Sequence, residues 1–193
     1  MSDPFVTKNI LKWYDLNKRS LPWRKNVSKE KRQYNTLISE FMLQQTQVAT
    51  VIPYFNKFVK EIPNIKKLAS VDNKKLIKLW EGLGYYSRAR NLKKAAQSVI
   101  KNFNGVIPDN FDDLKSLSGI GDYTANAILA IAFNKPYIPL DGNVERIIKR
   151  YLYLKKEKEI QKENLIEKKS ILGFSNRSSD YAQALMELSL IHI

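Results

Sequence analysis

Residues 117–126 read Leu117-Ser118-Gly119-Ile120-Gly121-Asp122-Tyr123-Thr124-Ala125-Asn126. Two glycines, separated by one residue, stand here directly before an apolar helical segment. Gly119 and Gly121 can adopt positive φ and leave the main chain bare, so N–H groups at the start of the following helix can approach an anion such as phosphate. A tight helix-to-helix turn that needs glycine is the alternative interpretation. The stretch therefore predicts a helix, a glycine turn and a second helix, with phosphate binding as its candidate use.

The chain of 193 residues is strongly basic. It has 33 Lys and Arg against 19 Asp and Glu, a formal net charge of +14, so a polyanion is its expected partner. The basic residues are spread along the chain, no apolar run approaches the ~20 residues of a transmembrane helix, and the first residues do not resemble a signal peptide. We therefore expect a cytoplasmic protein. The chain has no cysteine, which excludes disulfides and thiolate metal sites within it, and its one histidine, His192, is too isolated for a metal cluster.

Hydrophobic periodicity predicts an all-α fold. Helical spacing covers residues 5–16, 34–43, 48–58, 74–80, 88–99, 111–117 and 124–132. Turn residues separate these segments at 21–23, 62–64, 82–84, 104–108 and 136–143. The stretch 155–169 is rich in Lys and Glu and predicts a solvated helix with an apolar inner side.

Two carboxyl groups are candidates for catalysis. Glu40 lies in an apolar helical segment, where desolvation raises the pKa of an unpaired carboxyl toward the range of a general acid. A glutamate at the rim of the helix, whose carboxylate reaches solvent or a basic partner, is the alternative. Asp141 precedes another helix, where Asp is an ordinary N-cap; it can instead be an ionised carboxylate that faces positive charge developing on a substrate. An acid and an anion together suit cleavage of a glycosidic bond.

Two turns carry polar or aromatic tips that could insert into a base stack. Gln44-Gln45-Thr46-Gln47 interrupts an apolar helix, and Gly82-Leu83-Gly84-Tyr85-Tyr86 exposes an apolar and aromatic tip. Such side chains, inserted from the minor groove, unstack DNA and expose the glycosidic bond of an extruded nucleotide. A helix end and a glycine-capped turn are the plainer interpretations. The second tip is followed on one helix by basic residues placed for phosphates: Arg88, Arg90, Lys93 and Lys94.

Together these segments resemble the helix-hairpin-helix DNA glycosylase superfamily, and within it the MutY-type adenine DNA glycosylases. The resemblance runs from Trp13 to about Leu188 and rests on five motifs in family order. They are residues 21–24, 39–48, 82–91, the hairpin at 117–126, and 140–144. It implies a six-helix barrel domain at 25–135 and a second helical domain from 1–24 and 136–193, with the active site between them.

The resemblance also implies excision of adenine from duplex DNA where it is mispaired with 8-oxoguanine or guanine, the first step of base excision repair. Glu40 would protonate N7 of the flipped adenine and Asp141 would stabilise the oxocarbenium-like sugar, with Tyr123 and Asn143 as supports. Arg24 and Glu187 would contact the adenine. Gln45 and Tyr85 would form the wedge near the opposite base, with Thr46 and Leu83 beside them. Gln44 would also bind the DNA. A monovalent cation on the backbone carbonyls of Lys115, Leu117 and Ile120 would accompany the hairpin.

Tyr123 separates two branches of this family. Bifunctional relatives similar to endonuclease III carry a catalytic lysine at this position, two residues after the second hairpin glycine. A phenol cannot form the Schiff base of a lyase. The sequence therefore favours a monofunctional hydrolase over a glycosylase/lyase. We also expect the protein to be a monomer.

The end of the chain departs from the family pattern. Relatives continue after Leu188 into four cysteines that bind a 4Fe-4S cluster, and then into a domain that recognises 8-oxoguanine. This chain instead reads Ser189-Leu190-Ile191-His192-Ile193. We expect a truncated or misassembled gene product with a foreign tail from about Ser189. A DNA-binding fragment with impaired catalysis is therefore the alternative to an active enzyme.

Overall fold

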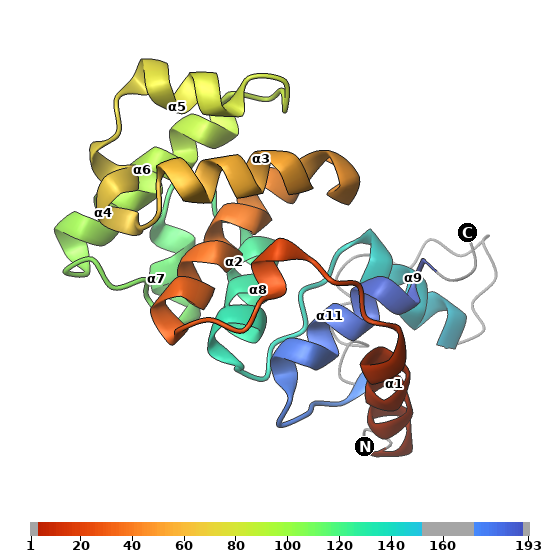
Figure 1. Ribbon diagram of the computed structural model, residues 1–193. Coiled ribbons are helices and arrows are strands. Elements are labelled where there is room, and N and C mark those ends of the chain that lie inside the picture. The colour runs from red at the N-terminus through yellow and green to blue at the C-terminus, as the bar shows by residue number, and fades with distance from the viewer. Residues whose placement is uncertain (1–3, 152–171, 191–193) are drawn as a thin grey trace. The chain divides into compact units, whose positions relative to one another are not determined.

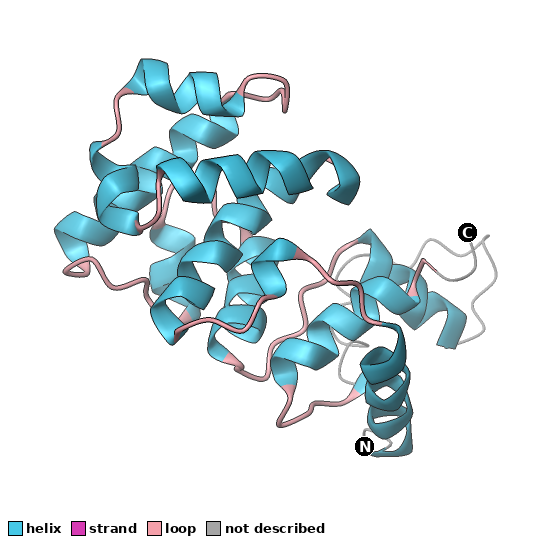
Figure 2. Ribbon diagram, viewed as in Figure 1, coloured by secondary structure: helices cyan, strands magenta, loops and turns pink. Residues whose placement is uncertain are grey.

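The computed structural model describes residues 4–151 and 172–190, and within these ranges every regular element is helical (Figure 2). This confirms the all-α prediction. No helix in the described ranges is long and apolar enough to span a membrane. The helix expected at 155–169 lies outside the described residues.

The chain divides into two compact units. Unit 1 comprises Met1–Arg19 and Leu129–Ile193, and unit 2 comprises Ser20–Ile128. The division falls inside one helix, between Ile128 and Leu129. Unit 1 is therefore built from both ends of the chain and unit 2 from its middle.

Unit 2 is a set of short helices around one central helix (Figure 1). Its elements are a 3-10 turn η1 (Pro22–Arg24), α2 (Lys29–Leu43), α3 (Val48–Glu61), α4 (Ile65–Ser70), α5 (Asn73–Trp80), α6 (Ser87–Asn102), α7 (Phe111–Ser116) and the first part of α8 (Asp122–Phe133). Several begin at a side-chain cap. Asn64, Asp72 and Asn110 each accept hydrogen bonds from backbone N–H groups in the first turn of the helix that follows. The six-residue helix α4 was not predicted, because its apolar residues Ile65 and Leu68 form only one i,i+3 pair.

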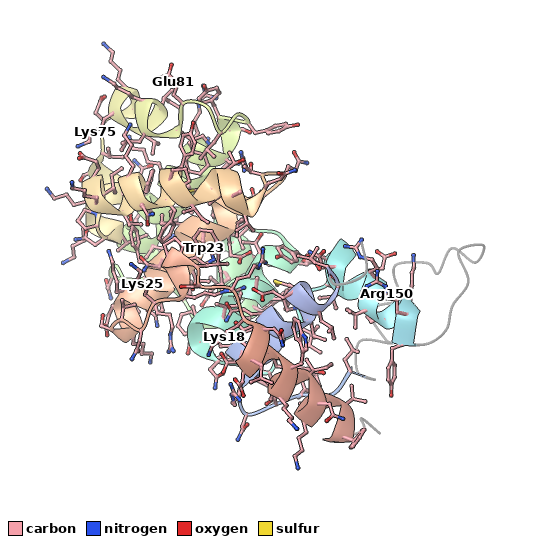
Figure 3. All side chains as sticks on the ribbon, turned by 45° about the vertical axis from the view of Figure 1, so that its right-hand side comes forward. Lys18, Trp23, Lys25, Lys75, Glu81 and Arg150 are labelled. Atoms are coloured by element: carbon pink, nitrogen blue, oxygen red, sulfur yellow. The ribbon has the colours of Figure 1, made fainter. Side chains whose placement is uncertain are left out.

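Helix α2 is the centre of unit 2, because every residue from Gln33 to Met42 is buried. The core beside it is rich in aromatic rings. Phe58 and Trp80 meet edge to face with centroids 6.0 Å apart, and Trp23, labelled in Figure 3, meets Phe55 at 5.3 Å. A candidate site on α2 is thus held by the best-packed element of the unit.

Unit 1 packs α1 (Pro4–Asn17), α9 (Gly142–Tyr151) and α11 (Ser178–Leu188) around a second apolar core. Its buried members include Tyr14, Val144, Ile148 and Leu185. At the edge of this core, Arg177 donates to Asp15 on α1 at 2.9 and 2.6 Å and to Asp180 on α11 at 2.9 and 2.7 Å. The first and last described helices are therefore joined by both packing and charge.

Candidate functional site

Glu40 lies in the last turn of α2 and is only 6% exposed. Leu37, one turn earlier, and the adjacent Phe41 are fully buried. The carboxyl therefore belongs to the packed side of unit 2, and the alternative of a solvated rim glutamate does not agree with this burial. A carboxyl removed from bulk water is in the surroundings that general acid catalysis requires.

The glycine turn between α7 and α8 packs against α2 and α6. Gly119 has φ +81°, and a Cβ there would lie 2.9 Å from Cε1 of Phe41 and 2.8 Å from Cβ of Asn91. Ser118 adds a hydrogen bond from Oγ to Oδ1 of Asn91 at 3.1 Å. Only glycine fits at position 119, so the turn is fixed against the helix that carries Glu40.

Gly121 differs from the expectation that both glycines use positive φ. Its φ is not positive, and a Cβ there would meet nothing within 4 Å. The residue is exposed at the start of α8, where backbone N–H groups have no partner within the helix. The open main chain of a helix start remains at Gly121, while the steric need for glycine belongs to Gly119.

Gln44 ties the end of α2 to this hairpin. Its Nε2 donates to the carbonyl of Gly119 and to Oγ1 of Thr124, each at 3.4 Å. We call residues Gln44–Gln47 the 44–47 loop, and residues Glu81–Tyr86 the 81–86 loop. The first loop therefore begins at a residue bound to the glycine turn.

Each loop carries a non-glycine residue in left-handed backbone conformation. Gln45 has φ +57° and Tyr85 has φ +48°, and both side chains are exposed, Tyr85 by 63%. This conformation costs on the order of 1–3 kcal/mol per residue and persists only where neighbouring contacts impose it. Leu83 is 5% exposed, which corrects the expectation of an exposed apolar tip there. The exposed side chains at the tip of the 81–86 loop are therefore aromatic and not aliphatic. In the 44–47 loop, Thr46 is half-buried and its hydroxyl lies 3.4 Å from the Gln44 carbonyl oxygen.

Arg88 does not lie where the phosphate role expected for it requires. Its side chain is 7% exposed and donates to backbone carbonyls of unit 2. Burial lowers the pKa of the guanidinium below its usual value. Arg90, two residues later on α6, is exposed and keeps the position of a candidate phosphate contact. Lys93 donates to Oδ1 of Asn73 at 2.7 Å.

Asp141 caps α9 in unit 1, and its two carboxylate oxygens have different partners. Oδ1 accepts from the backbone N–H of Asn143 at 3.0 Å and of Val144 at 2.8 Å, while Oδ2 accepts from Nδ2 of Asn143 at 2.8 Å. The capping interpretation is therefore present in the structure. It also leaves a half-exposed carboxylate held by three donors at a helix N-terminus, where negative charge is favoured.

The Asn143 side chain is itself oriented by two residues that the sequence did not predict as part of the site. Its Oδ1 accepts from Arg146 at 2.8 Å and lies 3.0 Å from the Ser189 hydroxyl. This arrangement turns Nδ2 toward Asp141. Ser189 is fully buried, and its carbonyl accepts from Arg150 at 2.9 Å; Arg150 is labelled in Figure 3. The first residue of the expected foreign tail is thus part of the packing of unit 1.

Glu187 is buried on α11 and bound to Arg19. Its carboxylate accepts from Nε of Arg19 at 3.1 Å and from the Arg19 backbone N–H at 3.3 Å. The two residues are 168 positions apart, so no sequence spacing indicated the pair. Arg24 and Tyr123 are both half-buried, at the end of η1 and in the first turn of α8.

The resemblance implies a 4Fe-4S cluster and a cation at the hairpin, and this chain differs in whether it has ligands for each. A 4Fe-4S cluster needs four cysteine thiolates, and because the chain has none, its residues do not supply the ligands. Within the described ranges no three His, Cys, Asp or Glu side chains come together as a metal site. At the hairpin, the Leu117 carbonyl accepts from the Ile120 N–H at 3.2 Å, and the Lys115 ammonium pairs with Asp122 at 2.5 Å. A carbonyl has a second lone pair, so this bond does not exclude a cation there.

Known proteins are similar to this chain in sequence and in fold. An adenine DNA glycosylase of Buchnera aphidicola subsp. Acyrthosiphon pisum is 43% identical over 97% of this chain, and the human adenine DNA glycosylase is 44% identical over 74% of it. The aligned parts cover 53% and 27% of those two relatives, so the chain spans about half the length of the bacterial one.

Solved structures give the same picture of the fold. A thermostable thymine-DNA glycosylase superimposes with a TM-score of 0.81 at 25% identity, over 97% of this chain and 85% of that one. A trapped endonuclease III–DNA covalent intermediate superimposes with a TM-score of 0.73 at 20% identity, over 94% and 82%. The sequence pattern of the HhH-GPD superfamily base excision DNA repair proteins matches residues 38–172, which include Glu40, the hairpin and Asp141. The chain belongs to the HhH-GPD superfamily of base excision DNA repair proteins.

Proposed function

We propose that this chain is a monofunctional adenine DNA glycosylase that removes adenine mispaired with 8-oxoguanine or guanine. The observation that carries the proposal is the buried carboxyl of Glu40 on the helix against which the glycine turn packs. The adenine DNA glycosylases at 43–46% identity support the choice of adenine as the base.

Glu40 is the proposed general acid. Its proton passes to N7 of the extruded adenine, the C1′–N9 bond breaks with its electron pair going to the base, and neutral adenine leaves. Water then adds to C1′ and loses a proton, which leaves an abasic site. Burial keeps the carboxyl away from bulk water until the base reaches it.

Asp141 is the proposed partner for the positive charge that develops on the sugar. The three N–H donors hold its carboxylate in place, and the bond from Nδ2 of Asn143 makes that residue a support. The carboxylate can act through its charge or through a transient covalent bond to C1′.

Tyr123 is the reason for proposing hydrolysis without strand cleavage. A lyase needs an amine that forms a Schiff base with the opened sugar, and a phenol cannot. Arg24 is a proposed contact to the adenine. Glu187 is a proposed contact as well, although its ion pair with Arg19 engages its carboxylate in this structure.

Duplex DNA is the proposed partner, bound by the exposed residues of unit 2. Gln45 and Tyr85 would enter the base stack, Arg90 would contact phosphate, and the main chain at Gly121 would approach another phosphate. A cation on the carbonyls of Lys115, Leu117 and Ile120, a monomeric state and a cytoplasmic location complete the proposal.

The test is single-turnover cleavage of a duplex with one adenine opposite 8-oxoguanine, with and without alkali. We expect strand breaks only after alkali, and none from Glu40→Gln, which keeps the size of the side chain but not its proton. Breaks without alkali would indicate a lyase. Duplex binding without any abasic site would instead support the second candidate, a DNA-binding fragment.

A further inference from the structure

Arg88 connects two segments of unit 2 that are far apart in the sequence. One terminal nitrogen, Nη1, donates to the carbonyls of Phe41 at 3.2 Å, Met42 at 2.9 Å, and Gln44. The other, Nη2, donates to the carbonyls of Leu83 at 3.0 Å and Gly84 at 3.2 Å. The first group is the C-terminal end of α2 and the second belongs to the 81–86 loop, which starts at Glu81, labelled in Figure 3.

The end of α2 provides carbonyls that a helix cannot satisfy by itself. The last four carbonyls of a helix have no N–H partner within it and carry partial negative charge. A guanidinium presents five N–H donors in a fixed plane, so it can bind several carbonyls at once, whereas an ammonium cannot span them. Arg88 thus stabilises the point where α2 stops and the 44–47 loop begins.

The same side chain also contacts the exposed tip of the other loop. The Arg88 guanidinium carbon lies 5.6 Å from the ring centroid of Tyr85 and 5.6 Å from that of Trp80. Trp80 is fully buried and Tyr85 is largely exposed, so the guanidinium joins a core ring to a surface ring. Tyr85 and Gln45 are the two non-glycine residues of these loops with positive φ, and such conformations need contacts that impose them.

We propose that Arg88 is a positioning residue that holds the 44–47 loop and the 81–86 loop as one unit for insertion into DNA. This role of Arg88 rests on the proposed function, because insertion of the loops matters only if adenine is extruded. In this role Arg88 does not itself contact the DNA. It sets where Gln45 and Tyr85 enter the base stack, and phosphate contact is left to exposed residues such as Arg90.

The experiment uses Arg88→Lys, which keeps the charge but cannot bind both groups of carbonyls. We expect its single-turnover rate on adenine opposite 8-oxoguanine to fall about 100-fold at saturating protein, as misplacement by about 1 Å can cost. The salt dependence of duplex binding should stay that of the wild type. Arg90→Gln, which removes a proposed phosphate contact, should instead reduce the salt slope by about 0.9. Lys101→Gln, exposed at the end of the same helix, is the control that should change neither.

Extrusion can be read separately from bond cleavage. With 2-aminopurine at the adenine position and Glu40→Gln to stop chemistry, we expect fluorescence to rise on binding. The rise should be lost when Arg88→Lys is added. A full rise in the double variant, a rate for Arg88→Lys equal to wild type, or a reduced salt slope for it would overturn the proposal. If Glu40→Gln alone shows no rise, the proposed function fails instead.

A measurement on the unaltered chain covers the case in which Arg88→Lys does not fold. The Thr46 amide donates to Leu43 and the Leu83 amide donates to Trp80, one in each loop. If Arg88 couples the loops, hydrogen exchange at these two amides should proceed through one shared opening, with equal protection and equal dependence on denaturant. Independent opening of the two loops would contradict the proposal whether or not the chain cleaves adenine.

Discussion

Gly119 shows how one residue determines the place of the hairpin. It combines φ +81° with an approach to Phe41 and Asn91 that leaves no room for a Cβ. Gly121 has neither constraint, although the two look equivalent in the sequence. A side chain at 119 would push the turn away from α2, the helix that carries Glu40.

We therefore predict that Gly119→Ala lowers the free energy of unfolding by at least about 1–3 kcal/mol, the cost of a strained backbone before the clash is added. Gly121→Ala is the matched control and should change it by less than about 0.5 kcal/mol. Urea unfolding followed by circular dichroism measures both. Equal losses in the two variants would show that the contact with Phe41 is not what makes Gly119 necessary.

At the scale of elements, the chain joins distant segments through charged side chains. Arg177 binds Asp15 on α1 and Asp180 on α11 in unit 1, as Arg88 binds α2 and the 81–86 loop in unit 2. The hydrogen bond from Arg177 lowers the pKa of the Asp15 carboxyl below its ordinary value of 3.8. The same bond, with that of Asp180, raises the pKa of Arg177.

The sign of the Asp15 shift gives a pH prediction. A depressed pKa in the folded state means that the pair contributes stability above pH 3.8, and that this contribution is lost as pH falls through the lowered value. Asp15→Asn should be less stable than wild type at pH 5, and the difference should shrink below pH 3.8. Urea unfolding at several pH values tests this. A difference that is constant or grows toward low pH would contradict the assigned pair.

Helices were predictable where apolar residues recur over two turns or more, as in α2, α3 and α6. The six-residue α4 was not predicted, because Ile65 and Leu68 form only one i,i+3 apolar pair. The equally short α7 was predicted, because Phe111, Leu114 and Leu117 repeat that spacing. The direction of Arg88 was also beyond the sequence: a basic residue at the start of an amphipathic helix reads as a surface cation, and its carbonyl partners lie up to 47 positions away. The contact of Asn143 with Ser189 depends on how α9 and α11 pack, which no local spacing encodes. Its bond with Arg146, three residues further along α9, is local.

At the scale of the whole molecule, the formal charge of +14 favours a polyanion. If duplex DNA is the partner, the logarithm of the binding constant should fall linearly with the logarithm of salt concentration, because bound phosphates release counterions. A footprint of about six phosphates would weaken binding about a thousandfold between 50 and 200 mM salt. Fluorescence anisotropy of a labelled duplex measures the slope. Binding that hardly depends on salt would contradict a surface that contacts phosphates.

If Glu40 is the acid that makes this chain an adenine glycosylase, chromatography of the released base measures its effect directly. A duplex with one adenine opposite 8-oxoguanine is incubated with excess protein, and the amount of free adenine released per duplex is measured. We expect one adenine per duplex from the wild type and none from Glu40→Gln, with both proteins folded and bound. Equal release from the two proteins, or no release from a wild type that binds the duplex, would contradict this expectation.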